Sequence, residues 1–292
     1  MVSTHSETFR IRHDECDAYG VLNNAAYLRL AQEVAWRHSI SAGYTPEYYS
    51  AMQRAWLARD TEIEYLRPVR YGDLLEVTTY VPATRRALAR RAYEFRISGS
   101  AELAAQAHTD WVFFDLAAAA PATIPAEIIE ALFGGSEAPQ VLRRAPFPDP
   151  PPPPPGAVSW RRRVEWRDID PMGHLNNAVY LSYTEEAAIE AGARYGVTRA
   201  GSTQAGIGWA VKRSRIEYLQ PAQAGDELEV RTWLGSVRQA SAERHYAIFR
   251  GSQQGLLARA QTLWLTVDLR TGRPRRIPGW MREAFAPNRA HA

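Results

Sequence analysis

The chain has 292 residues, of which 46% are hydrophobic and 23% charged, with a formal net charge of +3. This balance is typical of a soluble globular protein and excludes disordered, collagen-like and disulfide-stabilised scaffolds. The single cysteine, Cys16, can form neither an internal disulfide nor a multi-thiolate metal site, so we expect a reducing, cytoplasmic location. Basic and acidic residues nearly cancel, and no apolar run reaches the length of a membrane span. We therefore expect neither a nucleic-acid nor a membrane partner.

The first half of the sequence predicts one strand, one long helix and four further strands. A strand near Thr8–His13 leads into a turn with Asp and Gly, and Asn23 then offers a side chain suited to capping a helix. Apolar residues recur every three to four positions over Asn24–Ser41, as expected for a helix with one buried face. The four strands predicted next, some with alternating polarity, are Trp56–Leu66, Leu74–Pro82, Ala89–Ile97 and Ala107–Asp115.

The second half repeats the first at a fixed offset. Asp17 begins DAYGVLNNAAYL and Asp170 begins DPMGHLNNAVYL, with eight of twelve positions identical and an offset of 153 (170 minus 17). The same offset relates IEYL at 63–66 to IEYL at 216–219, and the Gly-Asp pair at 72–73 to that at 225–226. Such a repeat indicates a tandem duplication of one domain. It predicts a strand near Trp160–Trp166 and a helix over Asn177–Tyr195.

We therefore expect an N-terminal domain over residues 1–144, a linker over 145–158 and a C-terminal domain over 159–292. The linker contains six consecutive prolines, at 150–155, which favour an extended, semi-rigid spacer. Two dipeptides that each contain a glycine, Gly99-Ser100 and Gln254-Gly255, predict the hairpin turns between the last two strands of each copy. One strand, one helix and four consecutive strands make an α+β unit whose antiparallel sheet can wrap the helix.

These residues resemble the hotdog-fold thioesterases. The motif D-x-x-G-x-x-N-N-x-x-Y, followed by I-E-Y-L-x-P-x-x-x-G-D, is similar to the 4-hydroxybenzoyl-CoA thioesterase and acyl-carrier-protein thioesterase families. The resemblance covers nearly all of both repeats. It implies a double hotdog packed as an intramolecular pseudo-dimer, with active sites at the seam between the halves, and it leaves further homo-oligomerisation open.

The resemblance implies hydrolysis of an acyl thioester, carried by coenzyme A or an acyl-carrier protein, to a free acid and a thiol. A helix N-terminus can hold the oxyanion through backbone N–H groups and its partial positive charge. A neighbouring carboxylate can attack the carbonyl itself or activate a water, and both roles stay open. The resemblance places this carboxylate at Asp170, with His174 beside it, and at Asp17 in the first copy. The expected substrate-binding positions are Gly173, Asn176, Asn177, Gly20, Asn23 and Asn24. Neither a metal nor an organic cofactor is expected.

Several alternatives compete with this interpretation. An Asp before a turn is often only a turn former, and the two asparagines can serve only to cap the helix. Asp168, Asp170 and His174 could gather a metal, although so short a turn does not fix a ligand geometry. A hotdog hydratase or dehydratase is the alternative enzyme, and a non-catalytic acyl-binding module is the alternative from another class.

The two copies differ within the motif. His174 in the second copy corresponds to Val21 in the first, so the second copy is more similar to both families, and we expect Asp170 to carry most of the turnover. Three arginine clusters, at 85–86, 90–91 and 161–163, can meet the phosphates of coenzyme A or an acidic carrier protein. A solvated strand face is the simpler interpretation of these clusters, because nearly all basic residues in this chain are Arg.

Overall fold

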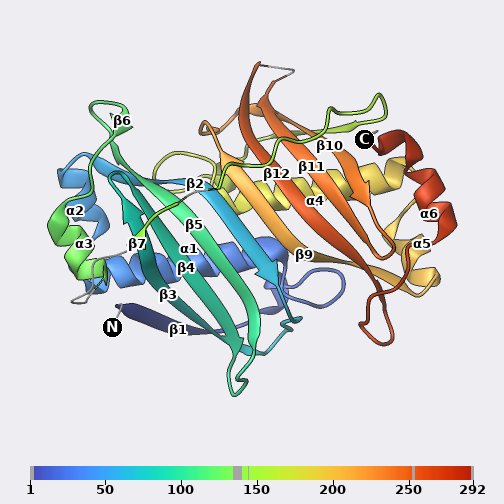
Figure 1. Cartoon of the computed structure of the whole chain (residues 1–292), viewed down its shortest axis with the longest axis horizontal. Helices are drawn as coiled ribbons and strands as arrows, with labels where there is room; N and C mark the ends of the chain where they lie inside the picture. The colour runs from blue at the N-terminus through green and yellow to red at the C-terminus, as the bar shows by residue number, and fades with distance from the viewer. Residues whose placement is uncertain (1–2, 134–139, 144, 252–253, 291–292) are drawn as a thin grey trace. The chain divides into compact units, whose positions relative to one another are not determined.

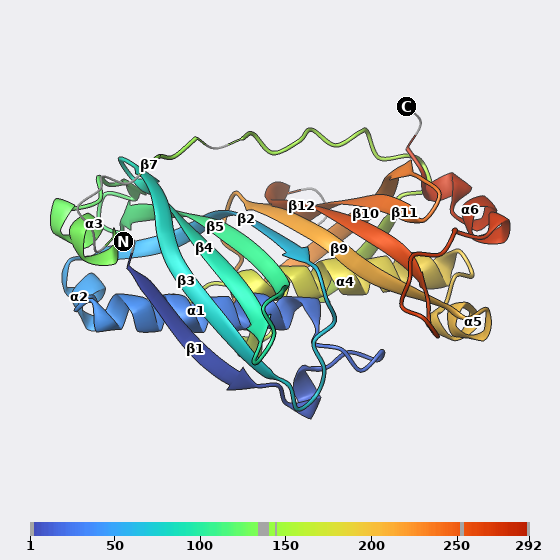
Figure 2. The same cartoon turned by 60° about the horizontal axis from the view of Figure 1, so that its bottom comes forward.

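The chain divides into two compact units, Met1–Pro146 (unit 1) and Phe147–Ala292 (unit 2). The structure, a computed structural model, describes residues 3–133, 140–143, 145–251 and 254–290. In each unit an antiparallel sheet curves around one long helix, as Figures 1 and 2 show. This is the α+β arrangement that the sequence predicts.

Unit 1 follows the predicted order of one strand, one long helix and four strands, with additional short elements. Its elements are β1 (Thr4–Arg10), η1 (His13–Glu15), α1 (Asn24–Ser41), α2 (Pro46–Ala51), β2 (Arg54–Tyr65), β3 (Leu74–Arg85), β4 (Leu88–Ile97), β5 (Leu103–Asp115), β6 (Ala120–Pro121), α3 (Ala126–Phe133) and β7 (Gln140–Val141). The main strands lie in the order β1-β3-β4-β5-β2. Thus β1 occupies an edge of this set and pairs antiparallel with β3.

The sequence placed the first strand four residues too late. It predicted Thr8–His13, whereas β1 ends at Arg10 and His13–Glu15 form a 3₁₀ turn. The polar residues of β1 alternate between half-buried and exposed positions, so this strand lacks a strong apolar signal. By contrast, β3 shows the predicted alternation clearly, with Leu75, Val77 and Val81 buried. Such alternation turns every second side chain toward the core.

Unit 2 repeats the order of the main strands and long helix, with differences in the short elements. Its elements are β8 (Val158–Arg163), η2 (Trp166–Asp168), α4 (Asn177–Arg194), α5 (Arg199–Gln204), β9 (Ile207–Tyr218), β10 (Glu227–Val237), β11 (Ser241–Arg250), β12 (Gln254–Asp268), α6 (Gly279–Ala284) and η3 (Ala286–Asn288). The main strands lie in the order β9-β12-β11-β10-β8. One predicted turn is wrong: Gln254 and Gly255 belong to β12 and not to a turn. The Gly99 turn is confirmed, and its φ of 84° suits a glycine.

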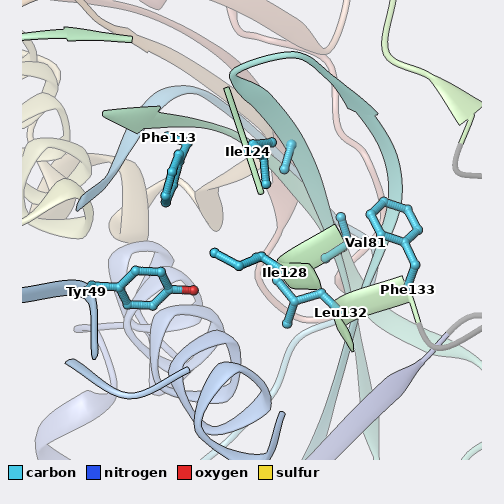
Figure 3. Close-up of a cluster of buried hydrophobic side chains, with 8 residues drawn as sticks. Tyr49, Val81, Phe113, Ile124, Ile128, Leu132 and Phe133 are labelled. Atoms are coloured by element: carbon cyan, nitrogen blue, oxygen red, sulfur yellow. The ribbon is translucent and has the colours of Figure 1, made fainter. Parts of the chain in front are cut away.

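A cluster of apolar side chains packs near the C-terminal end of α1 in unit 1. Figure 3 shows Tyr49 of α2, Phe113 of β5 and Ile128 of α3 converging there. Ile128 and Leu132 lie one helical turn apart, so both face this cluster. Unit 2 has an equivalent cluster, composed of Val197, Ile207, Leu234, Ala242, Ile277, Met281 and Phe285.

The proline-rich segment is packed against unit 2 rather than forming a free spacer. Phe147 is buried, and the guanidinium carbons Cζ of Arg215 and Arg259 lie over its ring, 5.2 and 4.7 Å from the ring centre. Farther along, Trp233 Nε1 donates a hydrogen bond to the carbonyl oxygen of Pro151 at 3.1 Å. Residues 147–156 therefore cross the face of this sheet opposite α4 (Figure 1).

Candidate active site

The candidate site in unit 2 is a tight turn just before α4. The Asp170 N–H donates to the His174 carbonyl at 2.9 Å, and the Gly173 N–H donates to the Asp170 carbonyl at 2.9 Å. Gly173 has a φ of 79°, in the left-handed region that favours glycine. A β-bridge between Ile169 and Leu175 closes the base of the turn. The turn therefore brings Asp170 and His174, two of the predicted site residues, together.

The Asp170 carboxylate is half-buried at this turn. Its Oδ1 accepts a hydrogen bond from the Met172 N–H at 2.9 Å. Burial raises the pKa of Asp170 above its ordinary value, whereas backbone N–H groups of Met172 and His174 and the nearby His174 side chain act in the opposite direction. Burial dominates because it removes water from the charged form. A carboxylate with this shift is a stronger base than an exposed one.

The two asparagines occupy the start of the helix. Asn176 is the N-cap of α4, and its Oδ1 accepts a hydrogen bond from the Ala178 N–H at 2.9 Å. Asn177 is the first helical residue. The capping role that the sequence offered for Asn176 is confirmed. The helix that it caps points its positive end toward the segment that carries Asp170.

Unit 1 contains the same turn. Asp17 Oδ1 accepts hydrogen bonds from the N–H groups of Tyr19 at 2.8 Å and Val21 at 3.3 Å. Gly20 has a φ of 74°, and Asn23 caps α1 through the Ala25 N–H at 3.0 Å. Asn24, like Asn177, is the first residue of its helix. The main difference lies at position 21, where valine lacks the imidazole ring of His174.

Paired tyrosines fix each helix start to the sheet. Tyr218 of β9 donates a hydrogen bond to the Asn177 carbonyl at 2.9 Å, and its ring lies 5.4 Å from that of Tyr180. The Tyr180 hydroxyl in turn accepts from the Ala222 N–H at 3.2 Å. In unit 1, Tyr65 and Tyr27 form the same ring pair. The sequence does indicate these pairs, because each tyrosine of unit 1 recurs in unit 2 at the offset of 153 within the repeated motifs.

Another contact was missed altogether by the sequence analysis. Tyr183 of α4 donates a hydrogen bond to Oδ2 of Asp168 at 2.7 Å, and Asp168 lies two residues before Asp170 in the sequence. The repeat could not indicate this pair, because the first copy has Glu15 and Leu30 at the same positions.

Two of the three arginine clusters contain residues engaged within the fold. Arg91 is 6% exposed and lies 2.9 Å from His38 Nδ1, and Arg90 pairs with the buried Asp110 at 2.6 Å. Arg161 and Arg162 of β8 also lie beside acidic side chains. These contacts argue against a phosphate site, and the interpretation as a solvated strand face is wrong for Arg91, which is buried.

Neither a metal cluster nor a membrane span is found in the part of the chain that the structure describes. No group there of three or more His, Cys, Asp or Glu side chains could hold a metal ion. Asp168 instead engages Tyr183, and Asp170 engages its own turn. Among these described residues, no helix combines the length and apolar character that crossing a bilayer requires.

The fold and the paired turns define a double hotdog protein, and comparisons with known proteins agree. The acyl-ACP thioesterase of Bacteroides thetaiotaomicron VPI-5482 has the same fold, with a TM-score of 0.70 and 16% identity, over 89% of this chain and 97% of that one. The 12:0-ACP thioesterase of Umbellularia californica gives a TM-score of 0.69 and 18% identity, over 90% and 97% of the two chains.

Sequence comparison identifies the family. The model of the thioesterase-like superfamily matches residues 11–132 and again 164–285, so the chain belongs to this superfamily. The two matched segments are themselves 153 residues apart (164 minus 11). The acyl-CoA thioester hydrolase YbgC of Escherichia coli O6:H1 is 28% identical over 119 residues, which cover 41% of this chain and 88% of that protein. The predictions of a tandem hotdog thioesterase and of a thioester hydrolase are confirmed.

Proposed function

We propose that this chain hydrolyses acyl thioesters carried by coenzyme A or an acyl-carrier protein, and that Asp170 is the principal catalytic carboxylate. The observation that carries the proposal is the half-buried Asp170, whose pKa is raised, in a glycine turn that leads directly into a capped helix. Membership of the thioesterase-like superfamily supports the reaction class. The names of its relatives, acyl-CoA hydrolase and acyl-ACP thioesterase, support the two carriers.

The reaction divides between the backbone and the carboxylate. The N–H groups of Gly173, Leu175 and Asn176 are already bonded within the fold. The positive end of α4, where the Asn177 N–H lies, therefore stabilises the negative charge that develops on the thioester oxygen. Asp170 either attacks the carbonyl carbon or removes a proton from the attacking water. In both routes the carbon–sulfur bond breaks and the sulfur leaves as a thiol. When water attacks, the acid is released directly; when Asp170 attacks, water then hydrolyses the mixed anhydride, which releases the carboxylic acid and restores the Asp170 carboxylate. His174 lies beside Asp170 and favours its ionised form.

Measuring thiol release separates this function from its alternatives. The purified full chain is supplied with acyl-CoA and acyl-ACP substrates of graded acyl length, and free thiol is followed with a thiol-reactive dye. Thiol release that Asp170→Asn abolishes supports the proposal. Hydration of an enoyl thioester without thiol release identifies a hydratase, and acyl binding without turnover identifies a binding module. Either of the last two results overturns it.

A further inference from the structure

A side-chain hydrogen bond connects the candidate catalytic turn to the body of α4 in unit 2. Tyr183 Oη donates to Asp168 Oδ2 at 2.7 Å. The carbonyl oxygen of the same Asp168 accepts from the N–H of the helix cap, Asn176, at 2.9 Å. Asp170 lies between these two residues in the sequence. Asp168 therefore fixes the start of the turn both to the helix cap and to a side chain farther along the helix.

The surroundings of Tyr183 keep this bond in place. Tyr183 is 5% exposed, and its ring packs edge-on against Trp160 of β8, with 5.5 Å between ring centres. Burial and the hydrogen bond to Asp168 raise the pKa of Tyr183, so the phenol keeps its proton and remains a donor at neutral pH. Arg162, also on β8, lies close enough to both Tyr183 and Asp168 for electrostatic contact. The strand, the helix and the turn are thereby joined.

Unit 1 lacks the chemistry for this connection. Leu30 occupies the position of Tyr183 and has no donor, and Phe9 occupies that of Arg162. Glu15, at the position of Asp168, accepts a hydrogen bond from the backbone N–H of Arg12 at 2.8 Å, within its own turn. The two units thus share the turn but differ in what holds it. The extra bond occurs in the copy that also carries His174.

We propose that Tyr183 and Asp168 are positioning residues, which hold the Asp170 carboxylate in its productive orientation. This inference rests on the proposed function of Asp170. The physical reason is preorganisation: a reacting group that must be placed within a fraction of an ångström loses about 100-fold in rate when it shifts by 1 Å. A turn that has this additional side-chain bond to a packed helix samples fewer orientations than one that lacks it. The asymmetry between the units then provides a structural basis for unequal activity.

The test uses three substitutions in the full chain. Tyr183→Phe removes the donor and Asp168→Ala removes the acceptor, whereas Asp168→Asn keeps an oxygen that accepts from Tyr183. We expect the first two to lower kcat for thiol release by about 10- to 100-fold, with KM nearly unchanged. Asp168→Asn is expected to keep most of the activity. The double variant Tyr183→Phe/Asp168→Ala should be no slower than either single variant, because all three lack the same bond.

Glu15→Ala in unit 1 is the matched control and is expected to leave kcat at the wild-type value. Thermal unfolding of each variant confirms that the assayed protein is folded. An active wild type whose kcat is unchanged by Tyr183→Phe overturns the inference alone, as does an Asp168→Asn variant as slow as Asp168→Ala. A rise in KM at constant kcat also overturns it. A wild type that releases no thiol from any substrate overturns the proposed function, and this inference with it.

Discussion

Replacement of Asp170 by Asn separates the charge of this side chain from its role in the turn. Asp170 Oδ1 accepts the Met172 N–H at 2.9 Å, and an amide oxygen at the same position can accept the same bond. Changing a charged acceptor to a neutral one weakens a hydrogen bond by about 1 kcal/mol. The same change removes a charge that burial disfavours. The two effects oppose each other, so we expect the free energy of unfolding to change by less than about 1 kcal/mol.

The sign of the second effect follows from the raised pKa. Between the unfolded and the folded pKa of Asp170, the native protein binds more protons than the unfolded chain, so its stability falls as the pH rises through this window. The amide side chain of the Asp170→Asn variant does not titrate, so the variant avoids this loss. At neutral pH it should therefore melt no lower than the wild type.

Activity should respond very differently. Loss of a catalytic carboxylate typically costs about 10²- to 10⁴-fold in rate, which corresponds to roughly 3–5 kcal/mol of transition-state stabilisation. The assay is thiol release under saturating and limiting substrate, together with thermal unfolding at the same pH. Asp17→Asn is the matched variant, because Asp17 Oδ1 also accepts backbone N–H groups; we expect it to lose less than about tenfold. Near-normal hydrolysis in Asp170→Asn with loss in Asp17→Asn would refute this reasoning.

Three further predictions concern the same turn and helix start. Burial raises the pKa of Asp170, so kcat/KM should decline on acidification with a midpoint above the ordinary Asp value of about 3.9. A pH–rate profile whose acid limb has its midpoint at or below that value contradicts the shift. Asn176→Ala removes the cap on the Ala178 N–H and should cost about 0.5–2 kcal/mol, measured by urea unfolding, whereas an unchanged midpoint would deny the cap any role. Gly173→Ala places a side chain at a φ of 79° and should cost about 1–2 kcal/mol, although a Cβ there would meet nothing within 4 Å. Gly279→Ala, with equally open space and no positive φ, is its control; equal stability losses in the two variants would argue against backbone strain.

The repeat made much of the fold predictable. It identified both long helices within one residue of their observed ends, because capping asparagines and a buried apolar face occur in both copies. It also located the turn before each long helix, since Asp accepts backbone N–H groups there and Gly adopts a positive φ. Strand β1 was misplaced because its polar alternation is weak, and its position depends on pairing with β3, which is distant in the sequence.

Other parts of the site depend on features that a single sequence does not carry. The direction of the Asp170 pKa shift is set by how much water the folded chain excludes from the carboxylate. The Tyr183–Asp168 bond occurs in one copy only, so self-comparison could not indicate it. Likewise, Arg91 looks like one of several surface arginines until the register of β4 turns it inward.

The segment over residues 147–156 has a consequence for how unit 2 resists aggregation. Trp233, which bonds this segment, and His245 lie on neighbouring strands, are 2% and 4% exposed, and have 5.9 Å between their ring centres. A run of prolines has no N–H groups and cannot extend a sheet, so it can shield such side chains without recruiting another strand. Its Pro151 carbonyl oxygen also accepts a hydrogen bond from the indole N–H of Trp233. A fragment that begins at residue 159 would uncover this aromatic surface, so the proline-rich stretch acts as a built-in cover as well as a connection.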